Sequence, residues 1–185
     1  MKMTRMMILG LLNNFGSMSG YEIQQMLQSS QTEMWAYVQP ASIYHALRKL
    51  QQEGKIILET VEHTGLRAKA IYKIAEDGVL ELRQLIEQSL SKSSVVFPAS
   101  LYTALTFMDE LPVPLILEAL GKQEREIAAV MAAMKHGEEM KAQAGAMTVQ
   151  AEAVFTNIYA QVGMQLEFIR KLIVDLESRQ EGESL

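Results

Sequence analysis

Residues suited to contact nucleic acid gather in the segment 40–53, where two kinds of side chain alternate at helical spacing. The apolar kind recurs at positions i, i+3, i+4 and i+7 and comprises Ile43, Ala46, Leu47 and Leu50. The opposite side carries Ser42, His45, Arg48, Lys49 and Gln52, with Ala41 and Tyr44 at its edges. This pattern predicts an amphipathic helix. The hydroxyl, imidazole and cationic groups on its outer side suit base edges and phosphates in the DNA major groove.

A second set of candidate contacts lies in a predicted β-hairpin just after this helix. Two runs rich in β-branched residues, 56–62 and 69–74, flank a polar stretch. Arg67 and Lys69 lie near its tip, where they would reach the DNA backbone or minor groove. Segment 38–73 carries six basic and three acidic residues, an excess that ordinary scatter would also produce.

Two predicted helices precede the basic one and would hold it in place. The first covers about 4–14 and is dense in apolar residues. After a turn at 15–18, Ser19 and Glu22 have the spacing of a capping box, in which each residue bonds the backbone of the other. This box predicts a second helix over about 20–28.

The order of the elements is more informative than any one of them. Pro40 suits the first turn of the third helix, and Gly54 suits its end. A fourth helix is predicted over 76–90. A basic helix face alone usually marks only a solvated surface. A helix, a capped helix, a basic helix, a basic hairpin and a last helix together predict a winged helix-turn-helix domain with a small hairpin wing over residues 1–92.

Residues 93–185 are predicted to form a helical dimerisation domain after a Ser-rich linker. A short helix is expected over 100–108, a long one over about 112–144 and a final one over 148–179. The final helix carries a heptad seam made of Ala151, Phe155, Ile158, Val162, Gln165, Ile169, Leu172 and Leu176. A second apolar stripe beside it consists of Val154, Leu166, Phe168 and Ile173. Antiparallel pairing with the preceding helix covers one stripe only, so we expect a homodimer. The overall fold class is mainly α.

Composition excludes several classes of protein. The 185 residues include no cysteine, and 49% are apolar against 21% charged, which is a globular balance. No apolar run approaches the roughly 20 residues of a membrane span, and the N-terminus lacks a signal-peptide pattern, so a cytoplasmic location is expected. Enzyme motifs are missing, and the histidines at 45, 63 and 136 are scattered. No catalytic, metal-binding or cofactor site is therefore expected.

Several stretches resemble the signature blocks of PadR-family transcriptional regulators. They are Ile8–Leu12, Ser19–Ile23, Ser42–Gly54, Arg67–Ile74 and Glu76–Gly78. The resemblance is strongest over 6–83 and looser beyond 97. It implies a homodimeric repressor whose paired winged-helix domains bind double-stranded DNA at a palindromic operator. Many members of the family release DNA when a small aromatic or lipophilic effector, or another signal, binds.

Nine residues are the predicted DNA contacts. They are Ser19, Tyr21, Ser42, Tyr44, His45, Arg48, Lys49, Arg67 and Lys69. By position, residues 44–49 fall on the family's recognition helix, Arg67 and Lys69 on its wing, and Ser19 and Tyr21 at the start of the second helix, whose amides commonly meet a phosphate. The chain departs from the family at His45, where proline is frequent, so the resemblance does not carry over an operator preference. It also departs at Ala75, where a capping threonine is frequent.

Two alternatives stay open at this point. Residues 1–92 carry ten Lys or Arg and nine Asp or Glu, whereas the rest carry seven and thirteen, so the acidic half is also consistent with a module that recruits a protein partner. A small-molecule pocket is the other alternative, and its candidate lining residues, which are equally good core residues, are Trp35, Tyr102, Phe107, Phe155 and Tyr159. For Trp35 we favour a core or inter-domain position over an effector platform.

Overall fold

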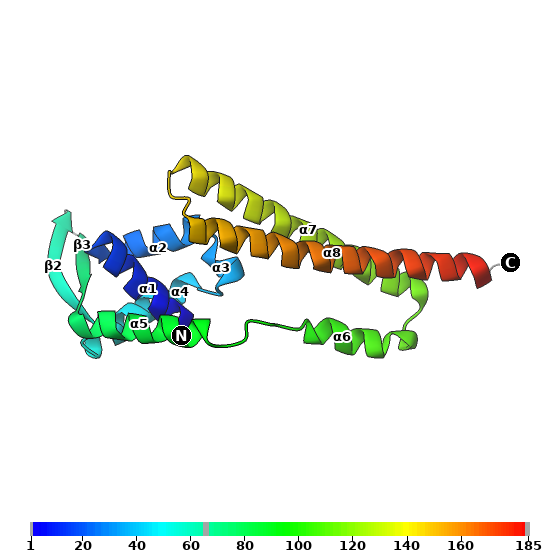
Figure 1. Cartoon of the computed structure of the whole chain (residues 1–185), viewed down its shortest axis with the longest axis horizontal. Helices are drawn as coiled ribbons and strands as arrows, with labels where there is room; N and C mark the ends of the chain where they lie inside the picture. Colours follow the sequence, from blue (N-terminus) through cyan, green and yellow to red (C-terminus); the bar gives the residue numbers. More distant parts are fainter. Residues whose placement is uncertain (1, 65–66, 184–185) are drawn as a thin grey trace. The chain divides into compact units, whose positions relative to one another are not determined.

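The computed structural model describes residues 2–64 and 67–183, with side chains for residues 2–62 and 68–179. The chain divides into two compact units, Met1–Ser94 and Val95–Leu185, and the division falls inside the Ser-rich linker. Helices dominate both units (Figure 1). No helix within the described ranges is both long and apolar enough for a bilayer crossing.

The first unit contains five helices and three strands within its described residues. In chain order they are α1 (Lys2–Phe15), β1 (Met18–Ser19), α2 (Gly20–Ser29), α3 (Thr32–Trp35), α4 (Pro40–Gln52), β2 (Ile56–Thr64), β3 (Arg67–Ile74) and α5 (Glu76–Leu90). The predicted helices and hairpin are all present, with ends shifted by a few residues. The predicted fold class, mainly α with a winged helix-turn-helix, is confirmed.

Two short elements of this unit were not predicted. Residues 15–18 were expected to form only a turn, but Met18 and Ser19 form β1 and pair antiparallel with β3. The sheet therefore has three strands in the order β1-β3-β2. The other unexpected element is the single-turn helix α3. Because Ser19 also begins α2, strand β1 fixes the start of that helix beside the wing.

The core of the first unit confirms the predicted inner side of α4. Ile43, Ala46, Leu47 and Leu50 are each at most 3% exposed and join a cluster with apolar residues of α1, α2 and β2. Burial of each large apolar side chain contributes roughly 1.5–3 kcal/mol, so this stripe fixes the rotation of α4 about its axis. The polar side of the helix consequently faces outward.

Two glycines allow α4, the wing and α5 to approach closely where they meet. Gly54 ends α4 with a φ of 69°, a conformation that glycine adopts without strain. Gly78, in the first turn of α5, packs against the backbone of Lys55, the residue after Gly54. A Cβ built on Gly78 would stand 2.1 Å from the carbonyl oxygen of Lys55. This position therefore requires glycine.

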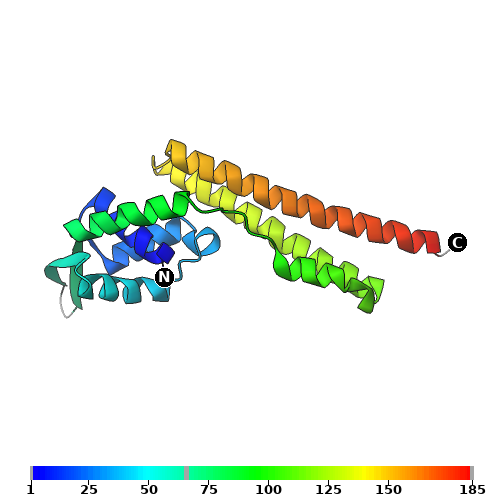
Figure 2. The same cartoon turned by 60° about the horizontal axis from the view of Figure 1, so that its bottom comes forward.

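The second unit is built around two long helices. Its elements are α6 (Ala99–Thr106), a 3-10 turn (Met108–Glu110), α7 (Val113–Gln143) and α8 (Val149–Glu183). Helices α7 and α8 run antiparallel side by side in both views (Figures 1 and 2). All eight positions of the predicted heptad seam are buried or half-buried. In the stripe beside the seam, Val154 is 44% exposed and the other three residues are half-buried.

Candidate nucleic-acid interface

The start of α2 is closed by the predicted capping box. The buried Ser19 is the N-cap, and its hydroxyl oxygen accepts a hydrogen bond from the Glu22 backbone N–H at 3.2 Å. Glu22 Oε2 in turn accepts from the Ser19 backbone N–H at 2.8 Å and from the Ser19 hydroxyl at 2.7 Å. These two bonds, together with the Lys69 ammonium, lower the pKa of Glu22 to about 2. The carboxylate is therefore ionised at any physiological pH.

The outer side of α4 presents a mixed set of groups. Tyr44, His45 and Arg48 are exposed. Lys49 is half-buried, and its ammonium lies 3.9 Å from Glu53 on the same helix side. Three of the predicted contacts on this helix are thus open to solvent, and a fourth is held in a weak ion pair.

Ser42 takes a different position from the other predicted contacts of α4. Its side chain is half-buried, and its hydroxyl donates to the carbonyl oxygen of Gln39 at 2.7 Å. The Ser42 hydroxyl oxygen also lies 3.3 Å from the hydroxyl oxygen of Thr4, which is buried in α1. Ser42 therefore lies at the junction of α1 and α4, where its hydroxyl closes the first turn of the helix.

An open groove of about 700 Å³ joins α2, α4 and the wing. Its lining residues are Ser19, Gly20, Tyr21, Tyr44, Ala68, Lys69, Ala70 and Tyr72. Gly20 allows the two helices to approach, since a Cβ built there would stand 2.9 Å from Cε1 of Tyr44. The groove thus brings together four of the nine predicted contacts, three tyrosine rings and one ammonium group.

The remaining predicted contacts lie outside this groove. His45, Arg48 and Lys49 lie further along α4, and Ser42 faces α1. The side chain of Arg67 lies outside the described part of the chain. Tyr72 was not among the predicted contacts. Its place on the same predicted strand as Lys69 was the signal that could have identified it.

The two wing lysines whose side chains the structure describes are paired with carboxylates. Lys69 Nζ lies 3.0 Å from Glu22 Oε1 and 3.9 Å from Glu62 Oε2. Lys73 Nζ lies 3.7 Å from Glu59 Oε1. The link between Lys69 and Glu22 crosses from β3 to α2, and sequence analysis did not find it because the two residues are far apart along the chain.

A partly buried network of ion pairs connects the helices that hold α4 in place. The Arg5 guanidinium on α1 bonds Glu81 on α5 at 2.7 Å and Glu53 at the end of α4 at 2.6 Å. The hydrogen bond to Glu81 is the main cause that raises the pKa of Arg5, and the hydrogen bond from Arg5 lowers the pKa of Glu53. This network ties three helices together and stabilises the orientation of α4.

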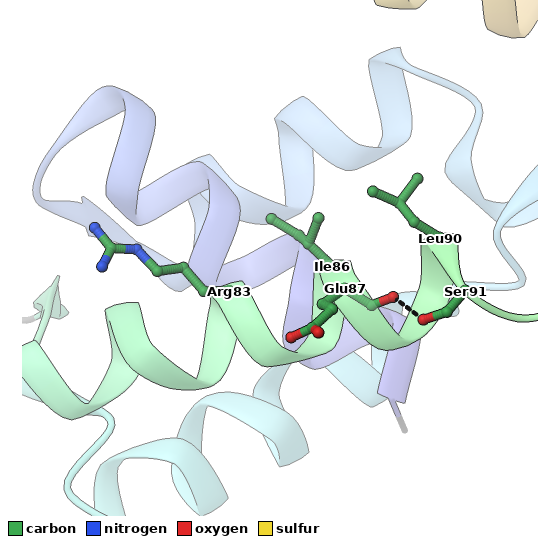
Figure 3. Close-up of a pocket in the computed structure, with 5 residues that line it drawn as sticks. All are labelled: Arg83, Ile86, Glu87, Leu90 and Ser91. Atoms are coloured by element: carbon green, nitrogen blue, oxygen red, sulfur yellow. Dashed lines mark hydrogen bonds between the residues drawn. The ribbon is translucent and has the colours of Figure 1, made fainter.

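A second hollow lies on α5 and is less specific. Figure 3 shows its lining residues Arg83, Ile86, Glu87, Leu90 and Ser91, which come from one helix and its end. All five side chains are exposed, and the Ser91 hydroxyl is bonded to the carbonyl oxygen of Glu87. The hollow is therefore an exposed, largely apolar strip and does not enclose a ligand.

The aromatic residues proposed to line a pocket are dispersed. Trp35 is 39% exposed on α3, and its indole N–H donates to the carbonyl oxygen of Ser30 at 2.8 Å, so it does not lie in the core of the first unit. Phe155 and Tyr159 are half-buried and stack at 6.2 Å between ring centroids. The Tyr159 hydroxyl donates a hydrogen bond to the Glu138 carboxylate. Burial, together with this carboxylate, raises the pKa of Tyr159 to about 12. Tyr102 and Phe107, also proposed, are exposed.

Within the described ranges, His, Asp and Glu form no group of three or more that could hold a metal ion.

The helices α2 and α4, joined to the β2–β3 wing, define the class of the first unit as a winged helix-turn-helix. The family model described as the transcriptional regulator PadR-like family matches residues 8–84. The first unit is thus similar to the PadR-like family of transcriptional regulators.

Solved structures match almost the whole chain. PadR from Bacillus subtilis in complex with operator DNA is 20% identical, with 93% of this chain and 98% of that chain covered at a TM-score of 0.73. The same protein in complex with p-coumaric acid is 19% identical, with 95% of this chain and 99% of that chain covered at a TM-score of 0.72. The PadR-like transcriptional regulator BC1756 from Bacillus cereus is 22% identical, with 95% of this chain and 99% of that chain covered at a TM-score of 0.71. These likenesses establish the fold, including the C-terminal helices. None of the curated proteins matches the sequence.

Proposed function

We propose that the chain is a PadR-type transcriptional regulator that binds duplex DNA with α4 in the major groove and the β2–β3 wing beside it. The observation that carries the proposal is the groove that joins the start of α2, the first turn of α4 and β3. It continues along α4 into the exposed Tyr44, His45 and Arg48. Such a surface offers base-edge contacts from the helix and phosphate contacts from its margins.

The predicted contacts take different parts in this proposal. His45 and Arg48 are the candidates for base edges, because they are exposed on the middle of α4. Lys49, Arg67 and Lys69 are candidates for phosphates. Tyr21 and Ser19 line the groove at the start of α2, where Ser19 serves the cap. We retain Ser42 as a support for α4 and not as a direct contact, since its hydroxyl is bonded within the protein.

We further propose that the second unit joins two copies of the chain. Apolar side chains remain exposed on its helices and at their ends, among them Phe107, Leu115, Met164 and Val174, which are 52–64% exposed. A second copy would cover them, and a two-fold axis would then present two α4 helices to successive major grooves. Half-sites would lie about 34 Å apart, so the operator would be palindromic.

Repression relieved by an effector is the regulatory part of the proposal. Its support is the p-coumaric acid bound in the structure of Bacillus subtilis PadR, whose fold this chain shares. A small aromatic or lipophilic molecule is accordingly the class of effector to test. The cytoplasm, where bacterial-type operators are found, is the corresponding place of action.

Selection of binding sites from random duplex DNA tests the proposal most directly. We expect a palindromic motif, bound by a dimer, with an affinity that falls with salt by about 0.9 log–log units per phosphate contact. An R48A/K49A variant should lose binding while remaining dimeric. The matched control is R83A/K92A, which removes the same charge from exposed positions in the same unit and should bind normally.

Failure to select any motif would refute the proposal, as would normal binding by R48A/K49A. Stoichiometric capture of a protein partner by a chain that selects no DNA would favour the recruiting module instead. The acidic second half of the chain is the observation that keeps this alternative in view.

A further inference from the structure

The Lys69 ammonium occupies a defined position before any DNA is present. Lys69 lines the groove with Tyr21 and Tyr44, and its Nζ lies 3.0 Å from Glu22 Oε1. The bond spans two elements, since Lys69 belongs to β3 and Glu22 to the first turn of α2. A candidate phosphate contact of the wing is thus already neutralised by a carboxylate.

The Glu22 carboxylate is held in place by hydrogen bonds at both of its oxygens. Its Oε2 accepts two hydrogen bonds from Ser19, and its Oε1 faces Lys69. One carboxylate therefore both closes α2 and holds a wing cation. A flexible surface glutamate would move away when a phosphate approached, whereas this one is retained by the cap. The negative charge consequently stays at the edge of the groove.

Phosphate binding at this groove has to contend with that charge. A phosphate oxygen near Lys69 would compete with Glu22 for the ammonium and would be repelled by the carboxylate. Contacts to phosphate raise affinity for every DNA sequence alike, because they carry no sequence information. A group that weakens such a contact lowers non-specific binding.

We propose that Glu22 is a positioning residue that restrains Lys69 and thereby limits the sequence-independent affinity of the protein for DNA. The proposal rests on the proposed DNA-binding function and assigns a regulating role to a residue that does not itself bind phosphate. Glu22 sets how much of the total affinity comes from the backbone and leaves discrimination to the outer side of α4.

The test is the E22Q variant of the full-length chain, measured on random-sequence duplex DNA. Glutamine keeps the capping box but removes the charge. We expect affinity to rise on the order of fivefold, as for the loss of one competing ion pair. The log–log salt slope should become steeper by up to about 0.9, the value for one further phosphate contact.

Two further variants separate this role from a general effect of charge. In a K69M background, E22Q should raise affinity by clearly less than in the wild type, because the cation that it releases is gone and only the repulsion between the carboxylate and phosphate remains. The matched control is E59Q, which removes one carboxylate paired at 3.7 Å with Lys73 on the same hairpin, outside the groove. It should change affinity by less than twofold.

Three results would overturn the inference: no gain in E22Q, an undiminished gain in the K69M background, or an equal gain in E59Q. These results differ from failure of the proposed function, in which the wild-type chain binds no DNA at low salt. If the wild-type chain binds and selects a motif while E22Q behaves identically, the function stands and the role of Glu22 falls.

Discussion

The two units of the chain differ in how completely each buries its own apolar residues. Among the described side chains, the main core of the first unit contains fourteen buried residues from helices, strands and connecting segments, whereas that of the second contains four. The units are similar in length, at 94 and 91 residues. A globular unit of this size with so small a core leaves much apolar surface in water. The first unit is therefore complete by itself, whereas the second leaves apolar surface for the association that we propose.

Polar contacts follow the same division. In the first unit Arg5 ties together α1, α4 and α5, and Ser19 and Glu22 tie α2 to the wing through Lys69. In the second unit, the ion pair between Arg170 and Glu124 links only α7 and α8. Fixed geometry is concentrated where we propose that DNA is read, and adaptable surface is concentrated where we propose that two copies meet.

The largest effect is expected from Gly78→Ala. The added Cβ would meet the Lys55 carbonyl oxygen, a backbone atom that yields only if the strand moves, so we expect a loss of about 3 kcal/mol in the stability of the first unit. Hydrogen exchange should show faster opening in residues 2–94 only. Gly10→Ala is the matched control, because nothing lies within 4 Å of the added Cβ and α1 should gain up to about 1 kcal/mol. Equal stability of the two variants would contradict the close approach at α5.

Val174→Asp is expected to have the next largest effect, and in the second unit. Val174 is 57% exposed in the single chain, so a charge there costs little until a partner covers it. We expect the dimer to dissociate at least about tenfold more readily in analytical ultracentrifugation, with the first unit unchanged. Thr156→Asp, at an exposed polar position on the same helix, serves as the comparison. An unchanged dimer would show that this side of α8 is not the interface.

Ser19→Ala should produce the smallest effect, confined to the start of α2. Loss of the N-cap hydroxyl should cost about 1 kcal/mol in thermal or denaturant unfolding. In the folded chain the pKa of Glu22 is about 2, below its ordinary 4.5. Its hydrogen bonds therefore stabilise the fold fully above pH 4.5, and that contribution is lost as the pH falls toward 2. The variant should lose less stability than the wild type over this interval.

Ser29→Ala provides the control for that measurement. Ser29 is exposed at the other end of α2, where its hydroxyl bonds only the carbonyl oxygen of Met26. Its removal should change stability by less than about 0.5 kcal/mol at either pH. If both serine variants show the same acid response, the acid sensitivity does not originate in the capping box.

Local patterns in the sequence predicted much of the first unit. The spacing of Ile43, Ala46, Leu47 and Leu50 identified the inner side of α4, and Ser19 and Glu22 identified the start of α2. Both signals lie within a few residues of each other along the chain, where helix geometry links them directly. The heptad seam of α8 was predicted for the same reason.

Features that depend on distant residues were not predicted. Strand β1 has two residues and exists only because β3 pairs with it, so the sequence around Met18 carries no strand pattern of its own. The inward turn of Ser42 depends on Thr4, and the restraint on Lys69 depends on Glu22. Each of these corrections concerns a polar group whose partner lies on another element.

Strand β1 has a consequence for the spacing between α4 and the wing. Its two residues join the backbone of β3 directly to the residue that begins α2, and α2 in turn packs against α4. Under the proposed function, the separation between α4 and the wing is therefore set by main-chain pairing and not by the side chains that would meet the double helix. Those side chains could then be exchanged for recognition of other target sequences, because the scaffold that spaces them would be left intact.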